Sequence, residues 1–211
     1  WDLETGACRR VLQGHLGAVL GLAFAPDGRV LASCAEDGSV LLWQAESGAC
    51  LRGFAGHREA VLAGAVSHDG RVLLTGARDR TARYWDLATG RCMRVFEGHG
   101  EPVTAAAFMP DGRFAVTGSV DGTVRLWDIR SRDCLRTFAA HVGGVSAVAV
   151  ALDGHHLASA GADGRVRVWY LDWRPDLRQT RGAEDAARPY LEAFLARHPN
   201  LTVAPGTTAT W

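Results

Sequence analysis

The sequence predicts an all-β protein made of four copies of one four-stranded antiparallel sheet, followed by a short C-terminal α-helix. The first observation behind this prediction is an internal repeat of 42 residues, since a segment from an Asp to a Trp recurs at Asp37–Trp43, Asp79–Trp85, Asp121–Trp127 and Asp163–Trp169. The second observation is that apolar runs of strand length alternate with turn signals inside each repeat. A fixed period in this range indicates an architecture of stacked repeat units.

Each repeat contains the elements of one sheet in a fixed order. An outer strand such as Cys50–Phe54 leads through a His to an apolar run, which ends at an Asp-Gly pair typical of a hairpin. The apolar runs are Val19–Phe24, Val61–Val66, Val103–Phe108 and Val145–Val150. A second strand, Val30–Ala35 in the first repeat, and a second turn then lead to the strand that ends in Trp. Because one sheet cannot bury both of its faces, neighbouring repeats must stack.

Charge and cysteine content limit the classes of function. The 211 residues carry 23 basic and 23 acidic side chains, and every basic one is Arg. This balance disfavours binding to nucleic acid or to a membrane surface, which needs a net basic face. No apolar run reaches membrane-spanning length. Four of the five cysteines follow the repeat, so we expect small buried side chains in a reducing cytoplasm rather than disulfides or metal ligands; they are Cys8, Cys34, Cys50, Cys92 and Cys134.

These residues resemble the WD-repeat β-propeller family from position 1 to about 170. The resemblance rests on a small residue followed by His, a Ser or Thr, an Asp and a Trp at the same offsets in four successive repeats. The Trp-Asp pair of the family stands at Trp1-Asp2, Trp85-Asp86 and Trp127-Asp128, and departs at Trp43-Gln44 and Trp169-Tyr170. The resemblance implies that each repeat forms one blade of a propeller, which holds protein or peptide partners without catalysis and without a cofactor.

The family's polar residues form one hydrogen-bonded set in each blade, which links the Trp indole, a Ser or Thr hydroxyl, the His and the turn Asp. The resemblance carries this role to Trp43, Ser33, His15 and Asp37; Trp85, Thr75, His57 and Asp79; Trp127, Thr117, His99 and Asp121; and Trp169, Ser159, His141 and Asp163. A Ser or Thr, a His and an Asp are also the parts of a nucleophilic triad. Because the set recurs in every blade, we expect it to satisfy buried polar groups, and one His per blade equally disfavours a metal site.

Positions at which the blades differ are the candidates for partner binding. In the family a preferred binding face carries the loop after the His and the turn at the Asp. Charged residues at these places are Glu36, Arg58, Glu59, Arg78, Arg80 and Glu101, and Arg80 replaces a Gly that the other three blades keep. Arg at such a rim suits bidentate contacts to a peptide. The alternative is ordinary solvated surface on a divergent repeat.

The two ends of the sequence depart from the repeat. We expect residues 1–14 to hold the trailing strands of a preceding blade, residues 15–175 the four blades, and residues 176–211 a tail with one amphipathic helix around Pro189–Leu195. The outer strand of the fourth blade comes either from Asp176–Arg178 or from the segment Cys8–Leu12. The stretch Ala187–Leu195 also resembles the tail that follows repeat arrays in large bacterial signalling proteins.

Three functions therefore compete. The leading one is a non-enzymatic scaffold or sensing module of a larger cytoplasmic signalling protein, which binds a protein or peptide on its loop face. The second is a self-assembling module that closes a ring between chains, because an open row of blades exposes apolar faces at both ends. The third is an enzyme with its site in the central channel, which no carboxylate pair, metal cluster or phosphate loop outside the repeated positions favours.

Overall fold

The computed structural model describes residues 2–171. The chain divides into one unit that spans Trp1–Leu171 and a second that spans Asp172–Trp211. The predicted helix around Pro189–Leu195 and the predicted outer strand at Asp176–Arg178 lie outside the described residues, so both stay predictions, as do the expected domain boundaries.

The described residues form strands in chain order, with the bounds that the repeat pattern predicts for the apolar runs. They are β1 (Val19–Phe24), β2 (Val30–Ala35), β3 (Val40–Gln44), β4 (Cys50–Phe54), β5 (Val61–Val66), β6 (Val72–Ala77), β7 (Ala82–Asp86), β8 (Cys92–Phe96), β9 (Val103–Phe108), β10 (Phe114–Ser119), β11 (Thr123–Asp128), β12 (Cys134–Ala139), β13 (Val145–Val150), β14 (His156–Gly161) and β15 (Val166–Tyr170). The prediction of an all-β repeat fold is confirmed.

Strands that follow one another in the chain pair with one another, so every sheet is an antiparallel meander. The sheets are β1-β2-β3-β4, β5-β6-β7-β8, β9-β10-β11-β12 and the three-stranded β13-β14-β15. The expectation of four strands in each of four blades therefore holds for three blades, while the fourth has three strands within residues 2–171. Its missing strand is the outer one, because β15 pairs with β14 alone in the described part of the chain.

The segment Cys8–Leu12 forms no strand in this chain. Its residues have the spacing of an outer strand, yet an edge strand forms only where a neighbouring strand offers backbone donors and acceptors. The Leu12 side chain instead lies close to Gly48 in the turn between β3 and β4. The role of this segment as a closing strand stays a prediction.

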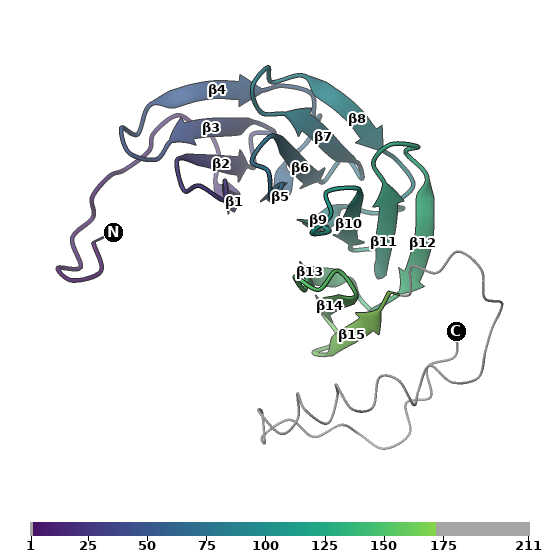
Figure 1. The fold of residues 1–211 in the computed structure, drawn as a ribbon. Helices are drawn as coiled ribbons and strands as arrows, with labels where there is room; N and C mark the ends of the chain where they lie inside the picture. The colour runs from purple at the N-terminus through teal and green to yellow at the C-terminus, as the bar shows by residue number, and fades with distance from the viewer. Residues whose placement is uncertain (1, 172–211) are drawn as a thin grey trace, which may run out of the picture. The chain divides into compact units, whose positions relative to one another are not determined.

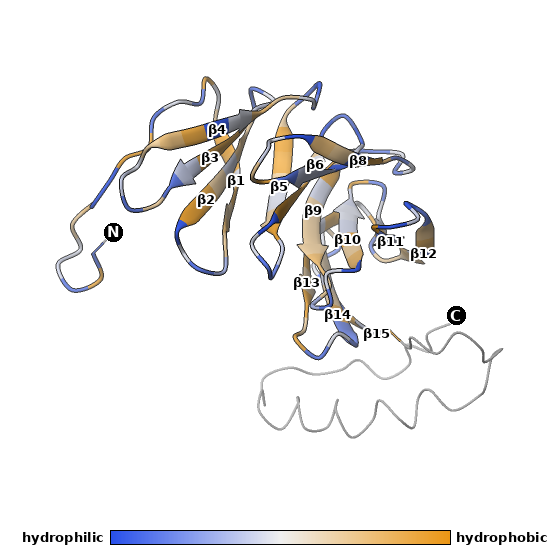
Figure 2. Ribbon diagram, turned by 45° about the horizontal axis from the view of Figure 1, so that its top comes forward, coloured by the Kyte–Doolittle hydropathy of each residue, from blue (hydrophilic) through white to orange (hydrophobic). Residues whose placement is uncertain are grey.

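The four sheets stand side by side, with their first strands innermost. Strand β5 contacts β1 and β9, and β9 contacts β13, while β4, β8 and β12 lie on the outer side (Figure 1). Figure 2 shows apolar colour on strands such as β2 and β5 and polar colour in the connecting turns. Apolar strands joined by polar turns are expected when each sheet buries its faces against its neighbours.

The core between sheets repeats from blade to blade. Val40 of one sheet and Val61 of the next belong to the first cluster of buried side chains, and Ala82 and Val103 take the same places in the second. Each outer strand also sends a Phe onto the Trp of the following blade. The ring centroids of Phe54 and Trp85, Phe96 and Trp127, and Phe138 and Trp169 lie 5.8, 5.4 and 5.0 Å apart. The sheets therefore interlock through identical contacts one repeat apart.

The expectation of buried cysteines is wrong for four of the five. Cys34 on β2 is buried, and burial raises the pKa of its thiol to about 12. Cys50, Cys92 and Cys134 open the outer strands, and Cys8 takes the equivalent place; all four are exposed. The reason is their position, since within residues 2–171 no further layer covers the outer strands.

Candidate functional site

Three of the four polar sets are joined throughout by hydrogen bonds, and the first set is joined from the Trp to the His. In the second blade the Trp85 indole donates to Thr75 Oγ1 at 2.8 Å, the same hydroxyl lies 2.8 Å from His57 Nε2, and His57 Nδ1 lies 2.9 Å from Asp79. The third blade repeats this chain through Trp127, Thr117, His99 and Asp121 at 2.8, 2.8 and 2.9 Å. The fourth repeats it through Trp169, Ser159, His141 and Asp163 at 3.0, 2.9 and 2.8 Å.

In the second and third blades, one assignment of protons satisfies the whole chain of bonds. If the His donates from Nδ1 to the carboxylate, its Nε2 accepts from the hydroxyl, whose oxygen accepts from the indole. This requires a neutral imidazole. Burial lowers the pKa of His57 and of His99 and outweighs the raising effect of the paired Asp, so both rings are neutral at pH 7.

The first blade departs from this pattern. Trp43 and His15 bond Ser33 at 2.7 and 2.6 Å, as expected. His15 Nδ1, however, bonds Ser39 at 2.8 Å, and Asp37 stands 3.6 Å away. The Asp37 carboxylate keeps its bonds from the backbone nitrogens of Leu16 and Ser39, which have equivalents at Asp79. Ser39 therefore takes over the contact to the ring, which the repeat pattern alone did not indicate.

These sets are unsuited to nucleophilic catalysis. The hydroxyls of Thr75 and Thr117 belong to fully buried residues and are each held between an indole and an imidazole. A nucleophile must reach its substrate and have an oxyanion site beside it. The arrangement instead gives each buried polar group a hydrogen-bond partner. A buried donor or acceptor without a partner would cost about 1–3 kcal/mol of stability.

The loop after each His and the turn at each Asp lie on one edge of the sheet. Antiparallel neighbours run in opposite directions, so alternate connections share an edge. Backbone bonds tie the two connections together: the N–H groups of Glu36, Arg78, Val120 and Ala162 donate to the carbonyls of Ala18, Ala60, Pro102 and Gly144. We call this edge, across all four blades, the loop edge.

The loop edge brings the six charged candidates onto one side of three adjacent blades. Glu36, Arg58, Glu59, Arg78, Arg80 and Glu101 are all exposed. An ideal Cβ at Gly38 would lie 3.3 Å from the carbonyl oxygen of Glu59, so the turn of the first blade touches the loop of the second. Among residues 2–171, no ion pair involves the guanidinium of Arg58, Arg78 or Arg80.

The backbone beneath these arginines is fixed. Asp79 accepts from the N–H of Arg58 at 3.2 Å, and Arg78 and Arg80 donate to Ala60 and Ala77 at 2.8 and 3.3 Å. The buried polar set therefore anchors the loop that carries Arg58. Side chains on such a backbone are presented to solvent from a defined place, which reduces the entropy lost on binding.

Arg80 adopts a backbone conformation that favours glycine. Its φ is +65°, whereas Gly38, Gly122 and Gly164 hold the equivalent turns at +79°, +82° and +71°. For a residue with a Cβ, this conformation costs roughly 1–2 kcal/mol. Arg132 also has a positive φ, of +72°. The equivalent positions in the other repeats are Gly6, Gly48 and Gly90.

Apolar side chains on the same edge were not among the charged candidates. Val120 and Val142, from the third and fourth blades, are exposed. An ideal Cβ at Gly144 would lie 3.0 Å from Val120 Cα, so the loop of Val142 packs on the turn of Val120. We call these two residues the apolar corner. The signal in the sequence is that Arg78 and Val120 occupy equivalent positions with opposite character.

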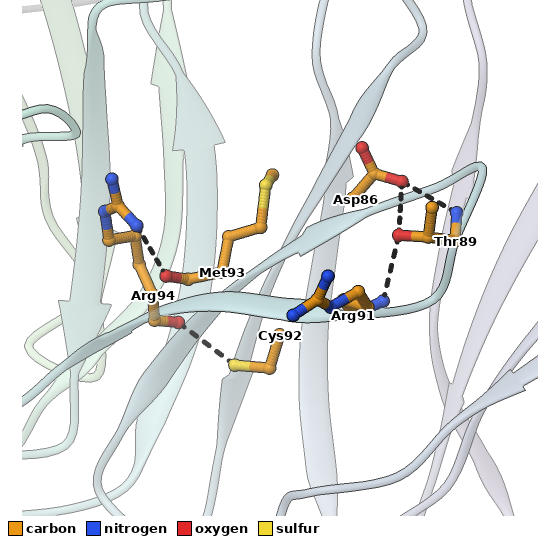
Figure 3. Close-up of a pocket in the computed structure, with 6 residues that line it drawn as sticks. All are labelled: Asp86, Thr89, Arg91, Cys92, Met93 and Arg94. Atoms are coloured by element: carbon orange, nitrogen blue, oxygen red, sulfur yellow. Dashed lines mark hydrogen bonds between the residues drawn. The ribbon is translucent and has the colours of Figure 1, made fainter.

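An open hollow of about 440 Å³ lies elsewhere, at the turn before β8 and along that outer strand. Its lining residues are Asp86, Thr89, Arg91, Cys92, Met93 and Arg94 (Figure 3). Asp86 accepts from both the backbone and the hydroxyl of Thr89 at 2.7 Å, and Cys92 Sγ bonds the Arg94 carbonyl at 3.3 Å. These polar groups serve the turn and the strand, and they provide no pairing of nucleophile and base.

Residues 2–171 contain no group of three or more His, Cys, Asp or Glu side chains arranged to hold a metal ion. The same residues contain no helix that is long and apolar enough to span a membrane.

Interlocked antiparallel meanders with one buried polar set each, and a loop edge that varies from blade to blade, define a repeat protein of the β-propeller class. Comparison with known families agrees. The family described as "WD domain, G-beta repeat" matches residues 6–44, 48–86, 90–128 and 132–170, more than half of the chain. The chain belongs to this family of WD-repeat proteins.

Curated relatives match over a single repeat. A stretch of 43 residues is 49% identical to Coronin-7 of Mus musculus and covers 20% of this chain and 5% of that protein. Stretches of the same length are 46% identical to Nuclear distribution protein PAC1 of Arthroderma otae and 42% identical to DDB1- and CUL4-associated factor 13 of Dictyostelium discoideum. Each covers 20% of this chain, and 9% and 10% of those proteins, so the chain spans a tenth or less of the relatives' lengths.

Proposed function

We propose that the chain is a non-enzymatic interaction module of a larger cytoplasmic signalling protein, and that it binds a protein partner on the loop edge of its second blade. WD repeats and WD-repeat relatives support a protein-interaction scaffold in general. The observation that carries the finer proposal is Arg80, an exposed residue with φ of +65° at a turn that glycine holds in the other three blades. A residue in a strained conformation whose charged side chain makes no ion pair within residues 2–171 is a candidate for function.

The chemistry of the loop edge favours an acidic partner segment. The guanidinium groups of Arg58, Arg78 and Arg80 form no ion pair within residues 2–171. Glu59 is the one acidic side chain among the candidates of the second blade. A guanidinium recognises a carboxylate through two parallel hydrogen bonds. The apolar corner at Val120 and Val142 lies on the same edge in the next blades, and gives an apolar side chain of the partner a place to dock.

Two further features support the cellular setting of this proposal. The formal charge of +0 offers no general attraction to nucleic acid or to an anionic membrane. Four exposed thiols persist unpaired most readily in a reducing compartment, which supports a cytoplasmic location. The signalling role and the bacterial origin rest on the resemblance of the tail segment Ala187–Leu195.

The experiment uses a defined probe. A phage-displayed library of random dodecapeptides is panned on the immobilised chain, and the enriched peptides are synthesised with a fluorophore. We expect them to be rich in Asp and Glu. Replacing Arg78 and Arg80 together by Ser should weaken their binding about tenfold or more, since each lost charge-assisted bond is worth about 1.5–3 kcal/mol when well formed.

A matched control removes the same charge from the opposite edge. Arg130 and Arg132 are exposed in the turn between β11 and β12, and that turn lies on the other edge of its sheet. Arg130→Ser with Arg132→Ser should leave peptide binding within about twofold of the unchanged chain, because a distant exposed charge is screened by salt. Undiminished binding after the change at Arg78 and Arg80, or equal loss in both double variants, would contradict the proposal.

A further inference from the structure

The exposed cysteines of the outer strands allow a comparison within one chain. Cys50, Cys92 and Cys134 open β4, β8 and β12, and all three thiols are exposed. Each thiol bonds the carbonyl two residues later, at 3.9, 3.3 and 3.4 Å respectively. Because the backbone around the three thiols is the same, differences in their chemistry must come from the side chains beside them.

The side chains beside Cys92 form the open hollow of about 440 Å³. Two of its lining residues, Arg91 and Arg94, are positively charged, against one carboxylate at Asp86 (Figure 3). This carboxylate already accepts two hydrogen bonds from Thr89 in the turn. Neither guanidinium forms an ion pair within residues 2–171. The hollow therefore has a surplus of positive charge beside a free thiol.

Arg94 lacks the contact that its equivalent makes one repeat earlier. Arg52 donates from Nη1 to the Thr89 carbonyl of the next blade at 2.9 Å. An ideal Cβ at Gly90 would lie 2.7 Å from Arg52 Cδ, so this path of the side chain needs a glycine in the turn. The third blade has Arg132 at the equivalent position, and its Cβ excludes Arg94 from the same path.

The guanidinium of Arg94 consequently has an unused donor. Its Nη1 donates to the carbonyl of Met93 on the same strand at 2.7 Å, whereas its Nε is fully buried and has no hydrogen-bond partner in the described part of the chain. Of the three buried side-chain atoms without a partner among residues 2–171, this one alone belongs to a residue that lines the hollow. A buried donor without an acceptor is destabilising. A ligand that brings an acceptor, such as a carboxylate, would remove this penalty.

The equivalent thiols have different charges beside them. The residue before the cysteine is neutral at Cys50, positive at Cys92 and negative at Cys134; the three residues are Ala49, Arg91 and Asp133. Charges beside a reactive group raise the local concentration of a reagent of opposite charge. An anionic reagent should therefore prefer Cys92 and react least with Cys134.

We propose that the hollow recognises a small acidic thiol in its disulfide form, and that Cys92 exchanges with it to form a mixed disulfide. The Cys92 thiolate attacks one sulfur of the ligand, so that a bond from Cys92 Sγ to this sulfur forms and the S–S bond of the ligand breaks. Cys92 is oxidised, and the other half of the ligand leaves as a thiolate and takes up the proton that Cys92 released. Arg91 and Arg94 hold carboxylates of the attached half by charge-assisted hydrogen bonds. The hollow is separate from the loop edge, so this proposal is independent of peptide binding there.

The first test exposes the reduced 211-residue chain to oxidised glutathione, a disulfide of an acidic tripeptide. The exchange is stopped by acid at a series of times, and mass spectrometry of proteolytic peptides gives the fraction of each cysteine that carries glutathione. At low ionic strength Cys92 should react about tenfold faster than Cys50, and faster still than Cys134. Added salt should reduce this preference, because it screens the charges. Equal rates at the three thiols would overturn the proposal.

A neutral reagent separates recognition of an acidic ligand from easy access to the thiol. 2-Hydroxyethyl disulfide undergoes the same exchange and carries no charge, so Cys50, Cys92 and Cys134 should react with it at similar rates. An equally large preference for Cys92 with this reagent would overturn the proposal, because the preference would then come from access alone.

Two variants test the arginines directly. Arg91→Ala gives Cys92 the flanking residue of Cys50, and Arg94→Gln removes the guanidinium that has the unused donor. Each change should slow the exchange of Cys92 with glutathione several-fold. The other exposed thiols should keep their rates, which verifies that the fold persists. The matched control is Arg136→Gln, at the equivalent of Arg94 in the third blade, and it should leave Cys92 unaffected. Undiminished exchange in either arginine variant of the hollow, or an equal loss in the control, would contradict the proposal.

Discussion

His15 and Asp37 stand 3.6 Å apart between Nδ1 and the nearer carboxylate oxygen, whereas His57 and Asp79, their equivalents one repeat later, are in contact at 2.9 Å. In the first blade the hydroxyl of Ser39 replaces the carboxylate as the partner of the ring, because it bonds His15 Nδ1 at 2.8 Å. The same four residue types therefore make two different networks, and the two blades should respond differently to loss of the carboxylate.

Asp79→Ala should cost about 1–2 kcal/mol more stability than Asp37→Ala. Both variants lose backbone hydrogen bonds to the carboxylate, but only the change at Asp79 leaves a buried imidazole N–H without its acceptor. Urea denaturation of the two variants measures the difference. Equal midpoints would contradict this, because the His57–Asp79 contact would then add no more stability than the His15–Ser39 contact.

Thr117→Val should lower the free energy of unfolding by about 2 kcal/mol, because the Trp127 indole N–H and His99 Nε2 lose their shared partner in a fully buried place. The melting temperature should fall by about 4–8 °C for a domain of this size. Thr117→Ser is the control, since Ser33 and Ser159 hold the same position in other blades. If the Ser variant loses as much as the Val variant, packing of the methyl group is responsible and not the hydroxyl.

Acid should destabilise the fold in two stages. Burial lowers the pKa of His57 and His99 from the ordinary 6.5. Below about pH 7 the unfolded chain therefore binds more protons than the folded chain, and the free energy of unfolding decreases as the pH decreases. Burial alone would raise the pKa of Asp37 and Asp121, but hydrogen bonds, chiefly from Ser39 and Thr123, lower both to about 2. Stability from these carboxylates is present above the ordinary value of 3.8 and is lost towards pH 2.

The pH series is read by urea denaturation from pH 8 to about pH 2. His57→Gln should flatten the first stage, between about pH 7 and pH 5, and leave the second unchanged. A first stage of the same slope in this variant would mean that other groups, and not the buried imidazole, take up the protons.

Much of the fold was predictable because local and repeated signals agree. The runs Val19–Phe24 and Val61–Val66 form strands with those bounds, since an Asp-Gly turn ends each of them and the hydrophobic pattern recurs. The polar candidates likewise share an edge because connections in a meander alternate between its two ends. These features depend on neighbours in the sequence or on positions one repeat away.

Features that depend on a single substitution or on the packing of an edge were not predictable. The exposure of Cys50 and Cys92 follows from the lack of a layer outside β4 and β8, and spacing does not reveal it. The contact between Ser39 and His15 needs side-chain geometry. Arg125 on β11 is half-buried, with its guanidinium 5.9 Å from the Trp127 ring centroid, and this packing also needs side-chain geometry.

Arg132→Gly should stabilise the chain by about 1 kcal/mol and leave peptide binding unchanged. Arg132 has a φ of +72°, which glycine adopts without steric cost, and it lies on the edge opposite the candidate site. The expected rise in melting temperature is about 2–4 °C. An unchanged or lower melting temperature would indicate that the Arg132 side chain makes a stabilising contact that offsets the strain.

The most direct test of the account measures stability and binding together in Arg80→Gly. Its turn is equivalent to that of Gly38, so relief of the left-handed conformation should stabilise the chain by about 1 kcal/mol, as for Arg132→Gly. Loss of the guanidinium should meanwhile weaken the selected acidic peptides several-fold, which Arg132→Gly does not do. A melting temperature that rises while peptide affinity falls is the predicted result. A variant that gains stability and keeps full affinity would contradict the claim that Arg80 is held in this conformation for binding.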